Sequence, residues 1–246
     1  MTIQNFSPYL HTIDVVVMRY AAGGQPGRIE VLLHQREHEP FKDAWALPGL
    51  VVNGDIPDPS IEAAVKRLMA SGKVGMEPIY LEQVGTEGNA TRDPRCWSST
   101  TFYLAIVAGD TPAGERQQFV PLADLVAQQR PAGPGRQANA YPLPFDHNRL
   151  CAMVADRLLS KSLYSSLPLL FLGDDVTLTG AVEVTASVLG RPVQKSSMRH
   201  RLLAMVAAGY LQETGLTKPQ AVGRPQYVIR NIKPGQVFFF DRCFER

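Results

Sequence analysis

The sequence predicts an α+β protein of two domains, a layered α/β/α domain in residues 1–140 and a winged helix-turn-helix domain in residues 141–246. Three observations support this prediction. The 246 residues are long for one domain and sufficient for two. Apolar, β-branched runs dominate the first half, whereas helical periodicity dominates the second. A stretch rich in Pro, Gly and polar residues at 128–140 separates the halves, and we expect the boundary in it or just after it.

The first domain is expected to combine mixed strands with two helices. Runs of Val, Ile and Leu bounded by glycine or proline indicate strands, which we expect at 12–20, 28–36, 79–84, 100–107 and 116–120. Apolar residues from Ile61 to Met69 recur at helical spacing after Pro59, which a first helical turn tolerates. We therefore expect helices at 59–69 and 122–128.

The second domain is expected to contain three helices followed by a two-stranded wing. The helices are predicted at 149–164, 179–189 and 195–208, and the strands at 210–214 and 226–230. Thr179 is the expected N-cap of the second helix, and Gly190 and Gly209 are expected to end the second and third. This order of elements is typical of a winged helix-turn-helix.

Charge and cysteine content narrow the class of protein. Residues 1–144 carry 12 Lys and Arg against 15 Asp and Glu, whereas residues 145–246 carry 13 against 8. The basic second half favours a polyanionic partner. Three widely spaced cysteines fit neither a disulfide framework nor a zinc site. No apolar run has the length of a membrane span, and the N-terminus does not read as a signal peptide, so we expect a cytoplasmic protein.

One segment keeps the frame of a catalytic motif without its acidic residues. The sequence Trp-Ala-Leu-Pro-Gly at 45–49 precedes a helix containing Glu62, and no acidic residue lies between Glu62 and Glu77. This layout resembles the Nudix box, whose helical glutamates hold magnesium against a pyrophosphate. Leu50 stands where the family pattern has its second glycine.

The loss of carboxylates argues against hydrolysis. Magnesium needs several hard oxygen ligands in near-octahedral geometry, and Asp55 and Asp58, in the loop before the helix, offer one oxygen each at most. Lys66 and Arg67 would repel a divalent cation on the same helix. We therefore expect no catalytic residue, no metal site and no cofactor.

The same domain contains candidates for binding a nucleotide-like effector. Aromatic rings can sandwich a purine, and guanidinium groups can bind phosphates through paired hydrogen bonds. The candidates are Arg36, Phe41, Trp45, Arg92 and Arg95. Each also has a structural interpretation, because Trp45 can belong to the core and loop arginines are commonly solvated.

The third helix of the second domain is the candidate DNA-reading element. On a helical wheel, Met198, Leu202 and Met205 form an apolar stripe, and small hydroxyl, His and Arg side chains lie opposite, as suits a helix in a major groove. Lys195 and Arg199 lie nearer the stripe, where they can reach phosphates or pair with a neighbour such as Glu183. The expected DNA contacts are Lys195, Ser196, Ser197, Arg199, His200, Arg201, Lys218 and Arg224. A winged helix can also bind proteins, so an interaction scaffold remains an alternative.

Short motifs in a specific order cover nearly the whole chain. They lie at 45–49, 80–83, 92–95, 143–147, 177–179, 189–192, 211–215 and 223–225. The combination resembles the NrtR family of bacterial regulators, in which a Nudix-like domain is fused to a winged helix. The resemblance implies a homodimer that binds near-palindromic operator DNA and releases it on taking up an effector. That effector is ADP-ribose in members that govern NAD metabolism, and relatives govern sugar pathways. The alternative function is a residual pyrophosphohydrolase acting on ADP-ribose or a related nucleotide.

Overall fold

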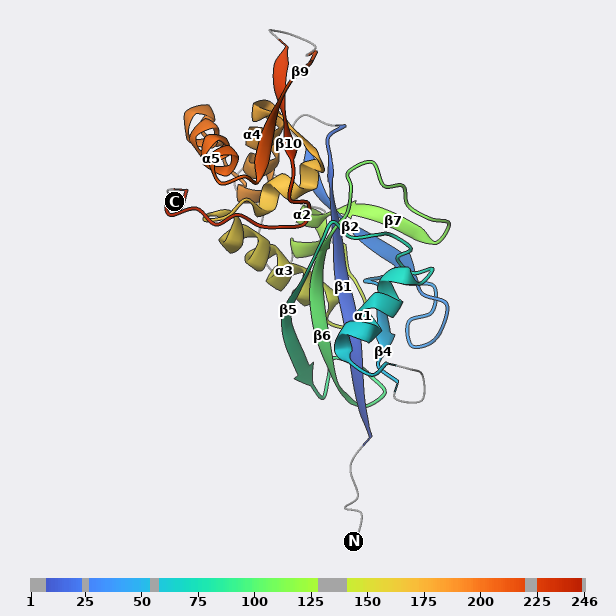
Figure 1. Cartoon of the computed structure of the whole chain (residues 1–246). Coiled ribbons are helices and arrows are strands. Elements are labelled where there is room, and N and C mark those ends of the chain that lie inside the picture. Colours follow the sequence, from blue (N-terminus) through green and yellow to red (C-terminus); the bar gives the residue numbers. More distant parts are fainter. Residues whose placement is uncertain (1–7, 24–26, 54–57, 128–140, 220–224, 245–246) are drawn as a thin grey trace.

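A mixed seven-stranded sheet forms the centre of the N-terminal part (Figure 1). The computed structural model describes residues 8–23, 27–53, 58–127, 141–219 and 225–244. The strands follow the order β3-β2-β1-β6-β5, with β4 paired to β1 and β7 to β2. Only β1 and β6, among the described strands, pair in parallel. The strands are β1 (Tyr9–Ala21), β2 (Arg28–Gln35), β3 (Trp45–Ala46), β4 (Gly49–Val51), β5 (Tyr80–Asn89), β6 (Trp97–Ile106) and β7 (Gln117–Pro121).

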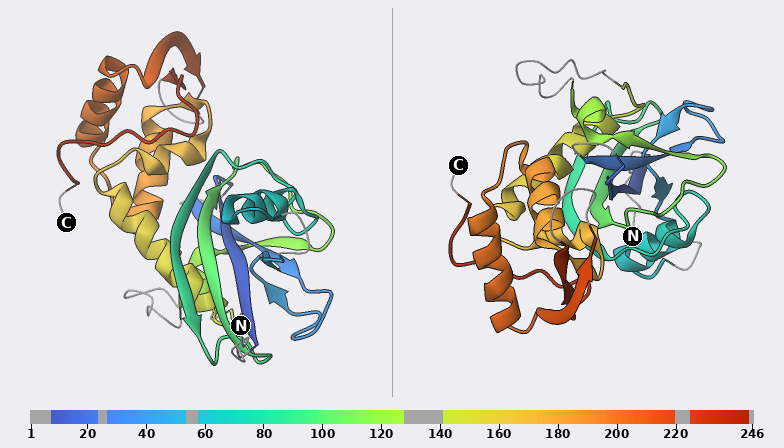
Figure 2. Two further views of the ribbon diagram at one scale, coloured as in Figure 1. Left: turned by 60° about the horizontal axis from the view of Figure 1, so that its bottom comes forward. Right: turned by 90° about the horizontal axis from the view of Figure 1, so that it is seen from above.

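Helices cover both faces of this sheet, as the alternation of apolar residues along β1 requires. Ile13 and Val15 lie in a buried cluster with residues of α1, whereas Val16 and Met18 lie in a second cluster with residues of α2 and α3. The helices are α1 (Ile61–Ala70), α2 (Leu122–Val126) and α3 (His147–Ser162). Two views show the resulting α/β/α sandwich (Figure 2), which confirms the predicted architecture.

The C-terminal part has the predicted order of helices followed by a wing. The 3-10 helix η1 and a short strand precede the two helices of the helix-turn-helix, and a three-stranded sheet of order β8-β10-β9 forms the wing. Beyond α3 the elements are η1 (Leu167–Leu172), β8 (Asp175–Val176), α4 (Leu178–Leu189), α5 (Lys195–Ala207), β9 (Leu211–Lys218) and β10 (Gln226–Asn231).

The ends of α4 follow ordinary capping chemistry, with one correction to the sequence-based prediction. Thr177, and not Thr179, is the N-cap, and its Oγ1 accepts a hydrogen bond of 3.1 Å from the N–H of Gly180. Thr179 instead donates its backbone N–H to the side-chain oxygen of Gln226 in β10. Gly190 ends the helix with φ of 65°, as predicted.

Helix α3 joins the two parts of the molecule. It contacts α2, three strands of the large sheet, and also α4 and η1. The helix therefore closes one face of the first domain although it follows residue 140, and the boundary there stays a prediction because 128–140 lie outside the described residues. None of the described helices is long and apolar enough to cross a membrane.

Candidate functional site

An open hollow of about 220 Å³ lies where β1, β4 and the residues before α3 meet. Because the segments that meet here come from distant parts of the chain, sequence spacing alone does not reveal the hollow. Its polar lining consists of Thr12, Asp14, Arg36, His38, Glu39, Lys73, Arg92, Asp93, Arg95 and His147. The hollow contains three of the five expected effector residues and several that sequence analysis did not select.

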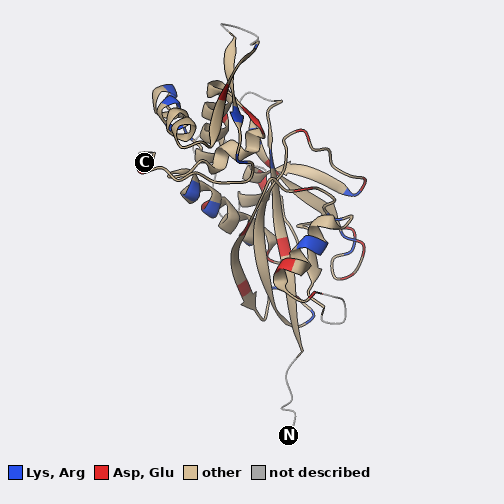
Figure 3. Cartoon of the chain, in the orientation of Figure 1, with Lys and Arg blue, Asp and Glu red and all other residues tan. Residues whose placement is uncertain are grey.

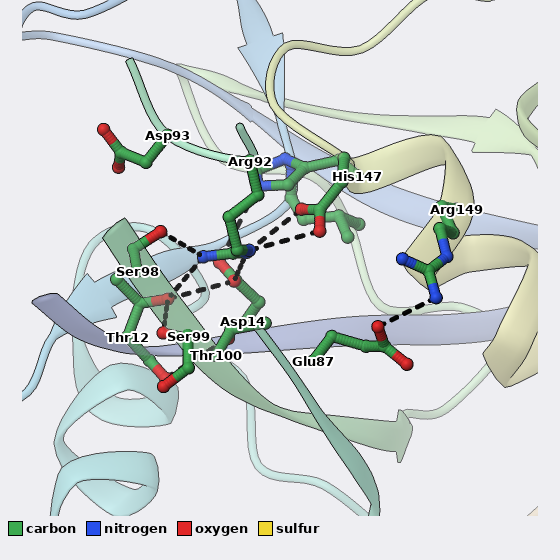
Figure 4. Close-up of polar contacts among 12 residues, drawn as sticks. Thr12, Asp14, Glu87, Arg92, Asp93, Ser98, Ser99, Thr100, His147 and Arg149 are labelled. Carbon is green, nitrogen blue, oxygen red and sulfur yellow. Dashed lines mark hydrogen bonds and ion pairs between the residues drawn. The ribbon is translucent and has the colours of Figure 1, made fainter. Parts of the chain in front are cut away.

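Arg92 is the centre of a buried polar network beside this hollow (Figure 4). Its guanidinium donates to both carboxylate oxygens of Asp146, at 3.1 and 3.0 Å, and lies 3.3 Å from Asp14. Further donors reach the hydroxyls of Ser98 and Thr12 at 3.4 Å. Arg92 is only 5% exposed, and its donors have protein partners. It therefore supports the wall of the hollow. Its guanidinium is not free to bind a phosphate, contrary to the expectation from the sequence.

His147, in the first turn of α3, is held as a neutral ring. Its Nδ1 accepts a hydrogen bond of 3.0 Å from the backbone N–H of Leu47, which a protonated imidazole cannot do. Its Nε2 therefore carries the proton and lies 3.8 Å from Oδ1 of Asp14. Burial lowers the pKa of His147, which also favours the neutral form of the ring.

Gly49 allows Asp14 to enter the network. The two residues are cross-strand partners in the β1–β4 ladder. A Cβ on Gly49 would lie 2.1 Å from the Asp14 carboxylate, so no other residue fits there without displacing the acid. The glycine of the eroded box thus has a packing role in this fold.

The other lining cations differ in how they are paired. Arg95 is exposed and binds the Asp93 carboxylate through two hydrogen bonds, at 3.0 and 2.8 Å. Arg36 donates 2.8 Å to the carbonyl oxygen of Pro40 and lies 4.9 Å from the centre of the Phe145 ring. Lys73 donates 2.6 Å to the carbonyl oxygen of Gly49. Lys73 was not among the predicted site residues, because nothing in its local sequence distinguishes it from a solvated lysine.

The aromatic ring of Phe145 lines the hollow. Phe41 packs edge-on against Phe145, with ring centres 4.9 Å apart. Trp45 instead packs against the hydrophobic core and does not line the hollow, which favours the structural interpretation of this residue. Phe41 is 42% exposed, and both phenylalanines have positive φ, a conformation that bulky residues rarely adopt.

The described residues of the eroded box do not fit a magnesium ion. Arg67 binds the Asp58 carboxylate through two hydrogen bonds, which removes that acid as a ligand. Glu62 is exposed in the first turn of α1 and does not line the hollow. Among the described residues, no group of three or more His, Cys, Asp or Glu is placed to hold a metal. Asp55 lies outside the described residues.

Helix α5 contains Lys and Arg residues but no Asp or Glu (Figure 3). Lys195, Ser196, Ser197, Arg199 and His200 are all exposed near its N-terminus, as the sequence predicted. Lys195 and Arg199 line a groove between α5 and the wing. Leu203 lies one turn further along this face and is 52% exposed.

Arg201 does not belong to this face, and its burial argues against the predicted DNA contact. It is 9% exposed and donates to the carbonyl oxygens of Leu163 and Arg242, at 2.9 and 2.8 Å. Its guanidinium stacks on the rings of Phe244 and Phe240, at 3.6 and 4.2 Å. The helical wheel placed Arg201 opposite the apolar stripe, but the C-terminal segment folds back and covers its guanidinium. Burial lowers the pKa of Arg201 to about 10, so it remains a cation at neutral pH.

Of the two cations expected to contact DNA from the wing, the structure describes Lys218. Lys218 is exposed but lies 3.2 Å from the Asp175 carboxylate, which also binds Arg230 at 3.0 Å. Arg224, the other predicted wing contact, lies outside the described residues. A role of either residue in DNA binding stays a prediction.

Comparisons with known proteins cover the chain almost from end to end. It is 32% identical over 237 residues to the ADPR responsive transcriptional repressor NtrR of Acinetobacter baylyi, which covers 96% of this chain and 87% of that protein. The chain belongs to the NrtR family. No family model matches it.

Two crystal structures of an NrtR protein support the assignment. Shewanella oneidensis NrtR is 32% identical and covers 96% of this chain and 100% of its own, with a TM-score of 0.76. The same protein complexed with a 27mer DNA is 31% identical, covers 95% and 99% respectively, and has a TM-score of 0.75. Both domains of the predicted fold are therefore those of an NrtR protein.

Three of the residues of this NrtR chain that sequence analysis missed are neighbours in the sequence. Phe145, Asp146 and His147 form part of a motif that contributed to the family resemblance, yet its position beyond the expected boundary assigned it to the other domain. In the structure these three residues complete the hollow and its supporting network. This motif was therefore the feature of the sequence that could have identified these residues.

Proposed function

We propose that this protein is an ADP-ribose-responsive transcriptional repressor without hydrolase activity. The observation that carries the proposal is the outer face of α5, where Lys195, Arg199 and His200 are exposed and no carboxylate is present. Similarity over the whole chain to a repressor, and to an NrtR protein complexed with DNA, supports the same function.

On this proposal α5 enters the major groove of an operator. Lys195 and Arg199 contact phosphates at its edge, and Ser196 and His200 approach base edges from the first turns. Leu203 is placed to contact a thymine methyl group. A homodimer presents two α5 helices to half-sites about 34–36 Å apart, which makes the operator near-palindromic.

The hollow is the proposed effector site. Its cations suit the diphosphate of ADP-ribose, and the exposed ring of Phe41 beside Phe145 suits stacking on adenine. The loss of the box carboxylates, together with the pairing of Asp58 to Arg67, supports binding without cleavage.

Helix α3 is the proposed connection between the two sites. Its N-terminal end lies at the hollow, where Asp146 binds Arg92. Its C-terminal end is bonded to α5 through Leu163 and Arg201. A displacement of α3 by bound effector would change the position of α5, and therefore the spacing of the two α5 helices in a dimer. By thermodynamic linkage, operator DNA must then weaken effector binding by the same factor.

The central experiment is a fluorescence-anisotropy titration of the full chain on its own upstream DNA, with and without ADP-ribose. We expect affinity that falls steeply with salt, because phosphate contacts release counterions, and that weakens at saturating ADP-ribose. Unchanged DNA affinity at saturating ADP-ribose would exclude this effector. Absent or salt-insensitive binding would favour a protein-interaction scaffold.

A hydrolysis assay tests the absence of catalysis. The protein is incubated with ADP-ribose and magnesium, and release of AMP is followed by chromatography. We expect no AMP above the level of the protein-free control. Turnover that is abolished in Glu62→Gln would establish the enzyme instead.

A further inference from the structure

Lys73 lies at the place where the hollow meets the eroded box. It follows α1 by three residues and is half-buried, and its Nζ donates 2.6 Å to the carbonyl oxygen of Gly49. An ammonium group has three N–H donors. The described residues supply one hydrogen-bond acceptor to it, so two donors are available to a ligand.

The cations that line the hollow are of two kinds, those that pair with a carboxylate and those that pair with no carboxylate of the described residues. Arg92 is neutralised by Asp14 and Asp146, and Arg95 by Asp93. Within the described residues, no carboxylate lies at ion-pair distance from Lys73 or Arg36, whose hydrogen bonds go to backbone carbonyl oxygens. Two cations that line the same hollow and pair with no described carboxylate favour the binding of an anion.

We propose that the Lys73 ammonium takes the place of a divalent cation, so that this hollow binds a diphosphate directly through Lys73 and Arg36 without any metal. The inference rests on the proposed function and specifies how the effector is held. Among the residues that the structure describes, no cluster of carboxylates is placed to hold a divalent ion, and Lys73 would repel one. A diphosphate needs no ion, because the lysine and the guanidinium neutralise its charge through charge-assisted hydrogen bonds.

The dimensions of the hollow agree with a diphosphate as the part that enters. Its volume of about 220 Å³ is below the range of about 300–1,000 Å³ typical of sites that enclose a whole drug-sized ligand. Burial also lowers the pKa of Lys73, and the positive charge of Arg36 contributes. The negative charge of an incoming anion offsets this cost of keeping Lys73 charged, which favours binding.

The test is isothermal titration calorimetry of the full chain in EDTA, with inorganic pyrophosphate and ADP-ribose as separate ligands. We expect both to bind without magnesium. Lys73→Met should weaken both by about 10- to 100-fold, the value of a lost charge-assisted hydrogen bond, while Lys73→Arg should retain most of the affinity. Lys66→Met, an exposed lysine on α1 away from the hollow, is the matched control and should bind like the wild type. Thermal unfolding of each variant verifies that it is folded.

The outcomes separate this inference from the proposed function. ADP-ribose binding that requires magnesium, or that Lys73→Met leaves intact, overturns the role of Lys73 and leaves the effector assignment standing. Pyrophosphate binding without ADP-ribose binding, lost in Lys73→Met, supports Lys73 and refutes ADP-ribose as the effector. Failure of both ligands to bind the wild type overturns the inference.

Discussion

Arg201 of α5 donates a hydrogen bond of 2.9 Å to the carbonyl oxygen of Leu163, the residue that follows α3. The bond connects the end of the helix that borders the hollow to the helix that carries the exposed cations. An arginine in the middle of α5 thus orients the helix from its inner side, while its neighbours Arg199 and His200 face outward.

Arg201→Ala should lower stability. The substitution removes two hydrogen bonds and two cation–π contacts from a buried site, and we expect a loss of about 2–4 kcal/mol in the free energy of unfolding. Urea denaturation of the full chain measures it. A stable variant with a selective loss of operator affinity would instead restore the DNA-contact interpretation.

Arg199→Ala should weaken DNA binding without lowering the stability of the protein. Because Arg199 is exposed, its removal should leave the free energy of unfolding nearly unchanged. If Arg199 contacts a phosphate, binding should weaken equally on operator and unrelated DNA. The slope of the logarithm of affinity against the logarithm of salt concentration should also decrease in magnitude by about 1. Anisotropy titrations at several salt concentrations provide both values, with Lys66→Met as control. A loss confined to the operator would identify a base contact.

Asp146→Asn should uncouple the two sites. Asparagine has no negative charge, and its NH2 group replaces one of the two oxygens that accept from Arg92 and cannot accept a hydrogen bond. We expect operator affinity without ADP-ribose to be retained, while the factor by which ADP-ribose weakens it, ordinarily about 5–150 for coupled sites, falls toward one. The measurement is the operator titration with and without ADP-ribose.

Arg149→Gln is the matched control for that variant. Arg149 also connects α3 to the sheet, through Glu87 at 2.8 Å, but it is half exposed (Figure 4). Exposed ion pairs contribute little, so its response to ADP-ribose should equal that of the wild type. Equal responses in all three proteins would refute coupling through Arg92 and Asp146.

Acidification should destabilise the protein through His34. This residue is 6% exposed, and burial together with the positive charges of Lys73 and Arg36 lowers its pKa to about 4. Between pH 6.5 and pH 4 the unfolded chain binds a proton at this histidine and the folded chain does not, so stability falls as pH falls, by about 3 kcal/mol from this residue. Urea denaturation across this range should show a flatter pH dependence for His34→Gln, and parallel curves would contradict the assignment.

Much of the local structure follows from the sequence. Strands and helices that carry a clear apolar period lie where the sequence predicted them, because periodicity reports which face of an element is buried. The short strands β3 and β4 and the 3-10 helix η1 were not predicted, since elements of this length have no period to detect. Their positions depend on the partners that they pair with.

The absence of acidic residues between Glu62 and Glu77 is likewise determined by the sequence, because no folding can place a carboxylate on a helix whose residues have none. What only the tertiary structure decided is which cations are free. Arg92 meets Asp146, 54 positions away, and Arg201 is covered by the C-terminal segment, whereas Lys73 and Arg36 line one hollow and form no ion pair with a carboxylate of the described residues. Such pairings depend on contacts between distant segments, so they cannot be predicted from the local sequence.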